Sequence, residues 1–544
     1  MAVDSDIVVT LDRQEEQNDV VPEEEAEPAS SPAHHPTAPP DELFDISTTV
    51  DPSYIISLIR KLLPVNDTER IERCYVNTTE NNGREKNETS LCEDGNTNLS
   101  MDEIKLMDTL DGVGEVSSQK GEDEESQQSL EHCGMSEREK TWEECGCILW
   151  DLAANKDHAE FMVQNLVLEV LSASLMVSKS ARATVRLISA VTSLEISLGI
   201  LGNLACHEVP GKLIASTNGL IGIIVDQLFL DDTPCLSEAC RLLSLGLQGK
   251  ECIAWAEALQ SEHILGRLLW VAENTLSAQL IEKSAGLCLA ILENQQEVMS
   301  ILLPTLMKLG LPNLLISLLD FEISKLKWER AAERYPVLDL ILRAIEALSV
   351  IDGYSQEVCS NKELLHLIRD LIELSDKDEV ASSCVTAAVL TANIMSDAPE
   401  VASEIAQDLT FLQGLLEILP FASDDLEARS AVWSTIGRIL ALVQESKLSP
   451  SSLCQYVLVL VSKSDILEED LLDHQVVDTN KEHESLTSTA QGINARTMAL
   501  RRIIDILILW TSLREHHPES RLEAENCSDD SSIKKMLDYC RKYT

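Results

Sequence analysis

Apolar residues recur through the larger, later part of the chain in segments long enough to form helices, and short polar breaks separate the segments. The clearest stretch is residues 198–247, LGILGNLACHEVPGKLIASTNGLIGIIVDQLFLDDTPCLSEACRLLSLGL. It predicts a helix ending at Ala205, a turn at 207–211, a short helix, and a helix over 220–230. A further helix should begin near Pro234. No strand-like alternation of any length interrupts these segments, so the pattern predicts an all-α protein.

The same composite pattern returns along the chain. In residues 389–419 Asn393 takes the place of Asn203, and in residues 147–175 Asp151 takes that place. Weaker copies centre on 243–247, 287–292, 341–350, 435–442 and 503–509. Copies of about 40–47 residues are typical of armadillo and HEAT repeats. We therefore expect an armadillo/HEAT-like α-solenoid of about eight units, with loop insertions at 178–193, 324–335 and 465–494.

The rest of the chain has a different character. Residues 1–50 combine six prolines with an acidic cluster, and residues 64–138 are again polar and acidic. Neither segment carries enough apolar surface to offset the entropy of ordering it, so both are predicted to be disordered. The organisation expected is a disordered acidic Pro-rich tail (1–50), a short amphipathic helix (51–63), a disordered acidic linker (64–138), an armadillo-like repeat domain (139–515) and a C-terminal tail with a short helix (516–544).

The short helix is predicted from its own signals. Asp51 can cap it, Pro52 suits the first helical position, and Pro64 ends it. The apolar residues on one face are Tyr54, Ile55, Leu58, Ile59 and Leu62. An isolated helix of this length is marginal in water, so we expect it to dock, either on the repeat array as a cap or on a partner. Docking within the chain is the favoured alternative.

Charge narrows the choice of partners. The chain of 544 residues has a formal net charge of −49. Residues 1–140 hold 34 Asp/Glu against 11 Lys/Arg, and the remainder holds 58 against 32. Both parts would repel nucleic-acid phosphates and an anionic leaflet, so we expect no nucleic-acid and no membrane partner. No apolar run approaches the ~18 residues that span a bilayer.

Cysteines and motifs argue against an enzyme. The 15 cysteines are scattered, there is no CxxC, and Cys145-Gly-Cys147 has no histidine at zinc-finger spacing. The chain opens without a secretory signal, which predicts a reducing compartment and no disulfides. No phosphate-binding loop, dinucleotide fingerprint, nucleophile elbow or metalloprotease motif occurs. We expect no catalytic activity, no cofactor and no metal.

The stretches WDLAANKDHAEFMVQN, SLGILGNLACHE and DTPCLSEACRLL, within residues 147–247, resemble the serum-amyloid-A-like (Saal) family. The resemblance covers roughly 100–150 residues. It implies a non-enzymatic helical repeat protein with an acidic N-terminal extension. It also implies a location in the nucleus and/or cytoplasm and a link to control of cell proliferation.

In armadillo proteins the third helix of each repeat lines the concave surface, where Asn side chains hydrogen-bond the backbone of a bound peptide. By this resemblance the candidate protein-binding residues are Asp151, Asn203, Glu346, Asn393 and Arg438. The Trp that usually accompanies the Asn one turn earlier is absent, since Gly199 and Val389 stand there. The alternative is that these polar side chains cap helix ends or satisfy local backbone groups.

The sequence therefore predicts a non-enzymatic scaffold that binds other proteins through an armadillo-type concave surface, with its acidic N-terminal arm engaging basic partners or competing for that surface. Two alternatives stay open: a regulatory subunit of an enzyme complex, and a nuclear-transport-type adaptor. The partner and the oligomeric state do not follow from the sequence.

Overall fold

The computed structural model describes residues 50–63, 137–181, 187–445, 449–478, 486–516 and 530–544. Residues 52–544 form one compact unit, and the unit before it lies almost wholly outside the described residues. The disorder predicted for residues 1–50 and 64–138 also falls outside them, apart from short stretches at 50 and 137–138. No strand occurs in the described ranges.

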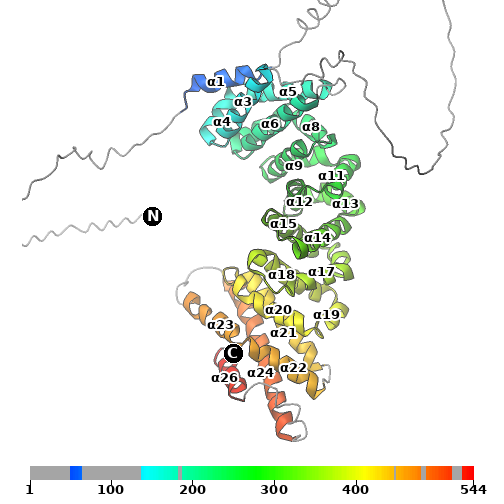
Figure 1. Cartoon of the computed structure of the whole chain (residues 1–544), viewed down its shortest axis with the longest axis vertical. Coiled ribbons are helices and arrows are strands. Elements are labelled where there is room, and N and C mark those ends of the chain that lie inside the picture. The colour runs from blue at the N-terminus through cyan, green and yellow to red at the C-terminus, as the bar shows by residue number, and fades with distance from the viewer. Residues whose placement is uncertain (1–49, 64–136, 182–186, 446–448, 479–485, 517–529) are drawn as a thin grey trace, which may run out of the picture. The chain divides into compact units, whose positions relative to one another are not determined.

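The described helices after α1 (Pro52–Lys61) fall into three series that repeat in order along the chain (Figure 1). The first helices are α4 (Lys156–Gln164), α7 (Glu208–Ser216), α10 (Cys252–Leu259), α13 (Gln296–Lys308), α16 (Ser355–Cys359), α19 (Pro399–Ile405) and α22 (Pro450–Ser462). The second helices are α5 (Val167–Ala181), α8 (Leu220–Val225) with the 3-10 turn η1 (Asp226–Phe229), α11 (Glu262–Asn274), α14 (Leu311–Trp328), α17 (Lys362–Ile372), α20 (Leu409–Ile418) with η4 (Leu419–Ala422), and α23 (Ser464–Asp478). The third helices are α3 (Glu137–Ala153), α6 (Leu187–Ala205), α9 (Thr233–Gln248), α12 (Ala278–Leu292), α15 (Tyr335–Ser349), α18 (Ala381–Asp397), α21 (Leu426–Glu445) and α24 (Leu486–His516).

The third helices form the continuous stack that joins the units. Each packs against the third helix of the next unit, from α3 through α6, α9, α12, α15, α18 and α21 to α24. Each from α6 to α21 also packs against the second helix of its own unit. Their apolar faces supply much of the core, including Leu198, Leu243, Leu287 and Ile341, none more than 1% exposed. This is an armadillo-type α-solenoid, as predicted, with eight third helices in the described residues.

Local signals set the helix ends much as the sequence indicates. Asn155 caps α4 by accepting from the backbone N–H groups of Asp157 and His158, and Asp232 caps α9 by accepting from Cys235. Gly310 has a φ of 90° before α14, a left-handed conformation that suits glycine. The predicted order over residues 198–247 is confirmed by α6, α7, α8 with η1, and α9.

Helix α1 docks within the chain. It packs against α3 and α4, and Ile55, Leu58, Ile59 and Leu62 are buried. The indole N–H of Trp142 in α3 donates to the backbone oxygen of Leu62 at 3.1 Å. Of the two arrangements that the sequence left open, the structure shows the first, in which α1 covers the exposed end of the array.

The C-terminal units differ from prediction. Residues 465–494 were expected to be a loop, but α23 fills 464–478 and α24 begins at Leu486. A buried ion pair explains much of the wrong loop prediction, because a buried Asp in a helix looks like a loop residue in the sequence. Nε of Arg429 in α21 donates to Oδ1 of Asp470 in α23 at 2.8 Å. After His516 the described chain resumes with α26 (Asp530–Lys542), which packs on α24 and α22 and buries Ile533, Met536, Leu537 and Cys540. The short helix expected in the C-terminal tail therefore packs on the last unit.

Two further sequence expectations about the described residues are wrong. The stretch Asp378–Asp397 is long and apolar enough, by length and composition, to cross a membrane, and two bent helix pairs would qualify if each were a single span. Serine and threonine residues interrupt this stretch, which hid it from a search for unbroken apolar runs. About half of it is buried inside the fold, where α18 packs between α15 and α21. The second exception is Cys454, which is disulfide-bonded.

Candidate functional site

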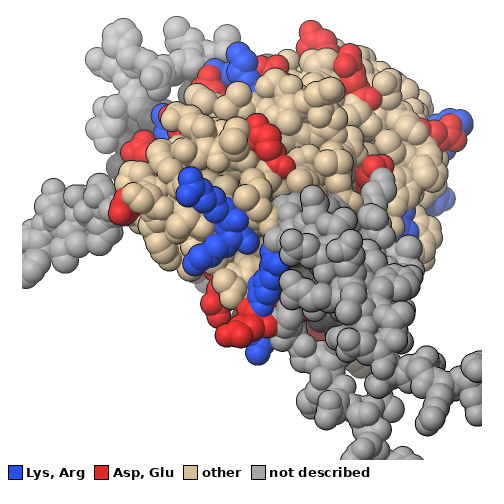
Figure 2. All heavy atoms as spheres, turned by 90° about the horizontal axis from the view of Figure 1, so that it is seen from above, with Lys and Arg blue, Asp and Glu red and all other residues tan. Residues whose placement is uncertain are grey.

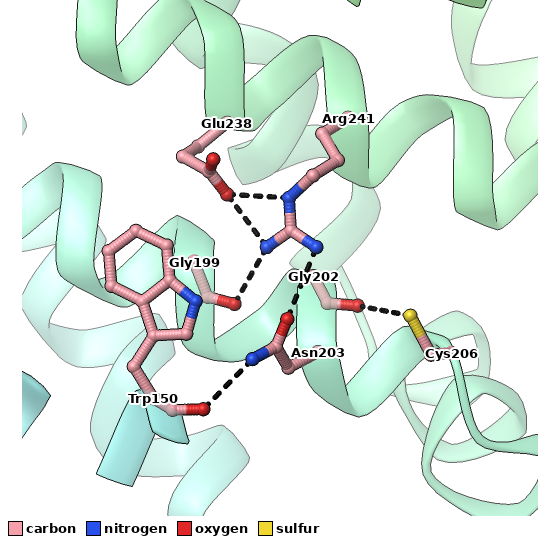
Figure 3. Close-up of polar contacts among 7 residues, drawn as sticks. All are labelled: Trp150, Gly199, Gly202, Asn203, Cys206, Glu238 and Arg241. Carbon is pink, nitrogen blue, oxygen red and sulfur yellow. Dashed lines mark hydrogen bonds and ion pairs between the residues drawn. The ribbon is translucent and has the colours of Figure 1, made fainter. Parts of the chain in front are cut away.

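Asn203, the best of the sequence candidates, lies in α6 between two neighbouring third helices (Figure 3). Its Nδ2 donates to the backbone oxygen of Trp150 in α3 at 2.9 Å, and its Oδ1 accepts from Nη1 of Arg241 in α9 at 3.2 Å. A carboxamide offers two donor hydrogens and two acceptor lone pairs. About half of that capacity is therefore used between units, and the rest remains for another group.

The bonds to α3 satisfy backbone carbonyls at the C-terminal end of that helix. The last four carbonyls of a helix have no partner within it. Beyond Ala153 the turn N–H groups of Ala154 and Asn155 reach two of these carbonyls in α3. Asn203 reaches the oxygen of Trp150, and His207 Nε2 lies 3.1 Å from the oxygen of Ala153. The following unit thus completes the hydrogen bonding at the end of α3.

Glycines bring these helices together. Arg241 Nη2 donates to the oxygen of Gly199 at 3.0 Å, and Nε of Arg241 donates to Glu238 at 2.8 Å. A Cβ on Gly199 would lie 2.2 Å from the Trp150 ring, and one on Gly202 would lie 2.4 Å from Arg241. The two glycines leave room for the indole and the guanidinium, so they serve packing.

The arrangement recurs in other units with different side chains. Asn294 Nδ2 donates to the oxygen of Leu247 at 2.6 Å, one unit back. Asn393 Nδ2 donates to Oγ of Ser349 at 2.9 Å, and Arg438 Nη1 donates to Oγ of Ser396 at 2.6 Å. We call the exposed sides of the stacked third helices the third-helix surface, and these cross-unit bonds run along it.

The five predicted residues all lie on third helices, but the structure does not gather them at one point. Asp151 is exposed, Asn203, Glu346 and Asn393 are half-buried, and Arg438 is exposed. Burial raises the pKa of Glu346, and the nearby Glu293 adds to this, while Arg343 opposes it. Their role in binding a partner stays a prediction.

Arg241 and Asn294 were not among the predicted site residues. Arg241 lies three residues before Ser244, which the repeat register aligns with Asn203, and Asn294 lies beyond the last residue of α12. Their acceptors are 42 and 47 residues away in the chain. A looser search could have found both residues. It would look for a polar side chain near the end of each third helix, about one repeat length after the end of the previous third helix, without requiring the exact position of Asn203 in the repeat.

Carboxylates of the first units lie at the third-helix surface and just beneath it: Asp151 is exposed, Glu143 and Glu195 are half-buried, and Glu238 is buried. We define the acidic cluster as Glu143, Asp151, Glu195 and Glu238. Burial raises the pKa of Glu195, and the charges of Asp232, Glu238 and Glu143 raise it further. The pKa of the Cys147 thiol is raised in the same way, first by partial burial and then by the negative charges of Glu143, Asp151 and Glu195. Glu195 therefore lies within electrostatic range of Glu143 and Glu238, and Cys147 lies within range of Glu143, Asp151 and Glu195.

Little else in the described residues suggests chemistry. No group of three or more His, Cys, Asp or Glu side chains there could hold a metal ion. Burial raises the pKa of the Cys240 and Cys288 thiols to about 12, which leaves them protonated and poorly nucleophilic. Both thiols lie in the core between α9 and α12, where they pack as small apolar groups.

Comparisons with known proteins find relatives in sequence over part of the chain. The chain is 26% identical over 246 residues to protein saal1 of Danio rerio, covering 43% of this chain and 49% of that protein. It is 28% identical over 152 residues to protein SAAL1 of Homo sapiens, covering 27% and 30%. The chain thus spans less than half of the length of these relatives. No family model matches it.

Among solved structures, an engineered protein is similar with a TM-score of 0.44 and 16% identity, over 75% of this chain and 86% of that one. The crystal complex SYS-1/POP-1 is similar with a TM-score of 0.43 and 13% identity, over 69% and 63%. A designed armadillo repeat protein in complex with the peptide (KR)4 is similar with a TM-score of 0.36 and 15% identity, over 47% and 95%.

Proposed function

The chain is a relative of the Saal proteins with an armadillo-type α-solenoid, and we propose that it is a protein-binding scaffold whose third-helix surface takes a basic peptide segment of another protein. The acidic cluster is the observation that supports this proposal. It lies on a surface that neighbouring third helices form together, so an extended segment could contact several units at once.

The electrostatics of the cluster favour a cationic ligand. Glu195 is half-buried beside other carboxylates, and its raised pKa reports that its charged form is disfavoured. Of the four cluster residues, Glu238 has an ion pair in the described chain, with Arg241 at 2.7 Å. A Lys or Arg side chain of a partner would relieve the repulsion among the others. Exposed Asp151 gives the partner a point of access.

The cross-unit hydrogen bonds supply rigidity. Arg241 is held by Glu238, Gly199 and Asn203, so it cannot swing out to neutralise the rest of the cluster without losing three partners. The unused capacity of the Asn203 carboxamide lies beside the cluster. A bound peptide backbone could hydrogen-bond to this free capacity. Asn203 would then bind a partner, as predicted, while it still links α3 and α9.

A labelled Lys/Arg-rich peptide tests the proposal by fluorescence anisotropy on the full chain. The double variant Asp151→Asn/Glu195→Gln should bind about 2- to 30-fold more weakly, because partly exposed ion pairs contribute about 0.2–1 kcal/mol each. The matched control Glu257→Gln/Glu273→Gln removes the same charge from exposed residues of α10 and α11. Equal weakening in both variants, or no binding by the unaltered chain, would refute the proposal.

The location and biological role implied by the family resemblance belong to this proposal as well. We place the protein in the nucleus and/or cytoplasm and expect a link to control of cell proliferation. Imaging of the tagged full chain, with growth measured after its depletion, tests both. A chain confined to a membrane compartment would contradict the location.

A further inference from the structure

A basic cavity lies at the start of the array, away from the acidic cluster. It is open, has a volume of about 730 Å³, and lies between the last turn of α1 and the first turn of α3. Its lining residues are Arg60, Lys61, Leu63, Glu137, Arg138, Thr141 and Trp142. Figure 2 shows Lys and Arg side chains gathered on this end of the molecule.

Three cations without an ion pair gather in this cavity. No carboxylate in the described residues forms an ion pair with Arg60, Lys61 or Arg138, and these three side chains line one cavity. Glu137 is the single carboxylate among the lining residues. Three cations around one carboxylate leave the cavity with an excess of positive charge that favours an anionic occupant.

The position of the cavity in the chain indicates the occupant. Leu63 and Glu137 both line it, so residues 64–136 leave the described structure and return to it at its rim. That segment holds 18 Asp/Glu against 6 Lys/Arg. Its densest acidic run, Glu122-Asp123-Glu124-Glu125, precedes Glu137 by only 12 residues. A chain of that length spans at most about 40 Å, so the run is held near the cavity.

We propose that the acidic run 122–125 of this chain binds in the cavity between α1 and α3, with its carboxylates paired to Arg60, Lys61 and Arg138. Attachment gives the run an effective concentration of about millimolar at the cavity, far above that of a free competitor. The contact would hold α1 and α3 together from outside, beside the bond between Trp142 and Leu62. It is independent of peptide binding at the acidic cluster.

Zero-length carbodiimide coupling on the full chain tests the contact, because it joins a lysine amine to a carboxylate only when the two touch. Mass spectrometry should find Lys61 joined to a residue of 122–125 within one chain. The variant Arg60→Gln/Arg138→Gln keeps Lys61 and every carboxylate of the run but removes the other two cations of the cavity, and it should lose this product at least ten-fold. The control Glu93→Gln/Asp94→Asn/Asp102→Asn/Glu103→Gln removes charges from the same segment but outside the run and should keep it. Products of Lys61 with residues 23–27, with another chain, or in equal yield from both variants would overturn the proposal.

A second measurement separates an internal occupant from an external one. A labelled peptide of residues 115–131 should bind the 122–125 variant, Glu122→Gln/Asp123→Asn/Glu124→Gln/Glu125→Gln, about ten-fold more tightly than the unaltered chain, because the attached run competes. Adding Arg60→Gln/Lys61→Gln/Arg138→Gln, three exposed positions, should abolish that gain. Equal binding to the unaltered chain and the 122–125 variant would show that the cavity is open to acidic segments of other proteins, which overturns the internal contact.

Discussion

Asn203 and Trp150 are 53 residues apart in the chain, yet the side-chain amide of Asn203 donates to the backbone oxygen of Trp150 at 2.9 Å. The bond crosses from one third helix to the next. It satisfies a carbonyl that α3 cannot satisfy by itself. Asn203 therefore stabilises the contact between two units, whether or not it also binds a partner.

Asn203→Ala should destabilise the fold by about 1–3 kcal/mol, because it leaves the Trp150 carbonyl and one donor of Arg241 without partners. Denaturant unfolding measures this free energy. Asp151→Ala, an exposed change at the matching position of α3, should stay within about 0.5 kcal/mol of the unaltered chain. If Asn203→Ala is as mild as Asp151→Ala, the bond to Trp150 contributes nothing to stability.

The buried pair of Arg429 and Asp470 should be among the most sensitive sites. Asp470→Ala leaves the Arg429 guanidinium and the Trp433 indole N–H, which donates to Asp470 at 3.1 Å, without this acceptor. Breaking a buried pair by removing one partner costs about 3–5 kcal/mol. Calorimetry should show the loss, and the apolar double variant Arg429→Met/Asp470→Leu should recover most of it. A double variant as unstable as the single one would contradict the reasoning.

Gly414 tests close packing between second helices of adjacent units. A Cβ there would lie 2.3 Å from the backbone oxygen of Ile372 at the end of α17. Gly414→Ala should lower stability by about 1–3 kcal/mol, since backbone cannot move aside as a side chain can. Gly266→Ala in α11 meets nothing within 4 Å and should raise stability by about 0.5–1 kcal/mol. Thermal melts of the two variants should shift in opposite directions.

Acid should weaken the α20 region in a defined pH range. Burial alone would raise the pKa of Glu417, but hydrogen bonds from Lys377, Lys463 and Gln413 outweigh it and lower the pKa to about 2. A carboxyl whose folded pKa is depressed stabilises the fold above its unfolded pKa of 4.5, and this contribution is lost as pH falls towards 2. The stability gap between the unaltered chain and Glu417→Gln should therefore be full at pH 6 and shrink between pH 4.5 and 2.

Urea unfolding at several pH values measures that gap. Glu297→Gln is the matched control, because it removes the same charge from an exposed side chain with no ion pair in the described residues. A Glu417→Gln gap that persists unchanged at pH 2.5 would show that the carboxylate charge is not what stabilises the contact.

Sequence reasoning recovered the parts of this fold that depend on local pattern. The order of α6 to α9 could be predicted because apolar spacing, a turn and Pro234 all lie within fifty residues. Helix α23 could not, because its buried Asp470 looks like a loop residue until Arg429 is placed beside it. Nor could the partners of Asn203 be predicted, since repeat register predicts which helix face a residue occupies but not which carbonyl lies opposite.

The cross-unit bonds make the array directional. Asn203, Asn294 and Arg438 each donate backwards, to acceptors of the preceding unit. If units are lost from the C-terminal end, the third helix that becomes the new end loses the side-chain donors that had bound the carbonyls of its last turn. If units are lost from the N-terminal end, the new end exposes the donor side chains instead. A nearest-neighbour array of this kind has unequal ends. A C-terminal end therefore presents helix carbonyls, an N-terminal end presents side-chain donors, and in this chain α26 packs on the last unit.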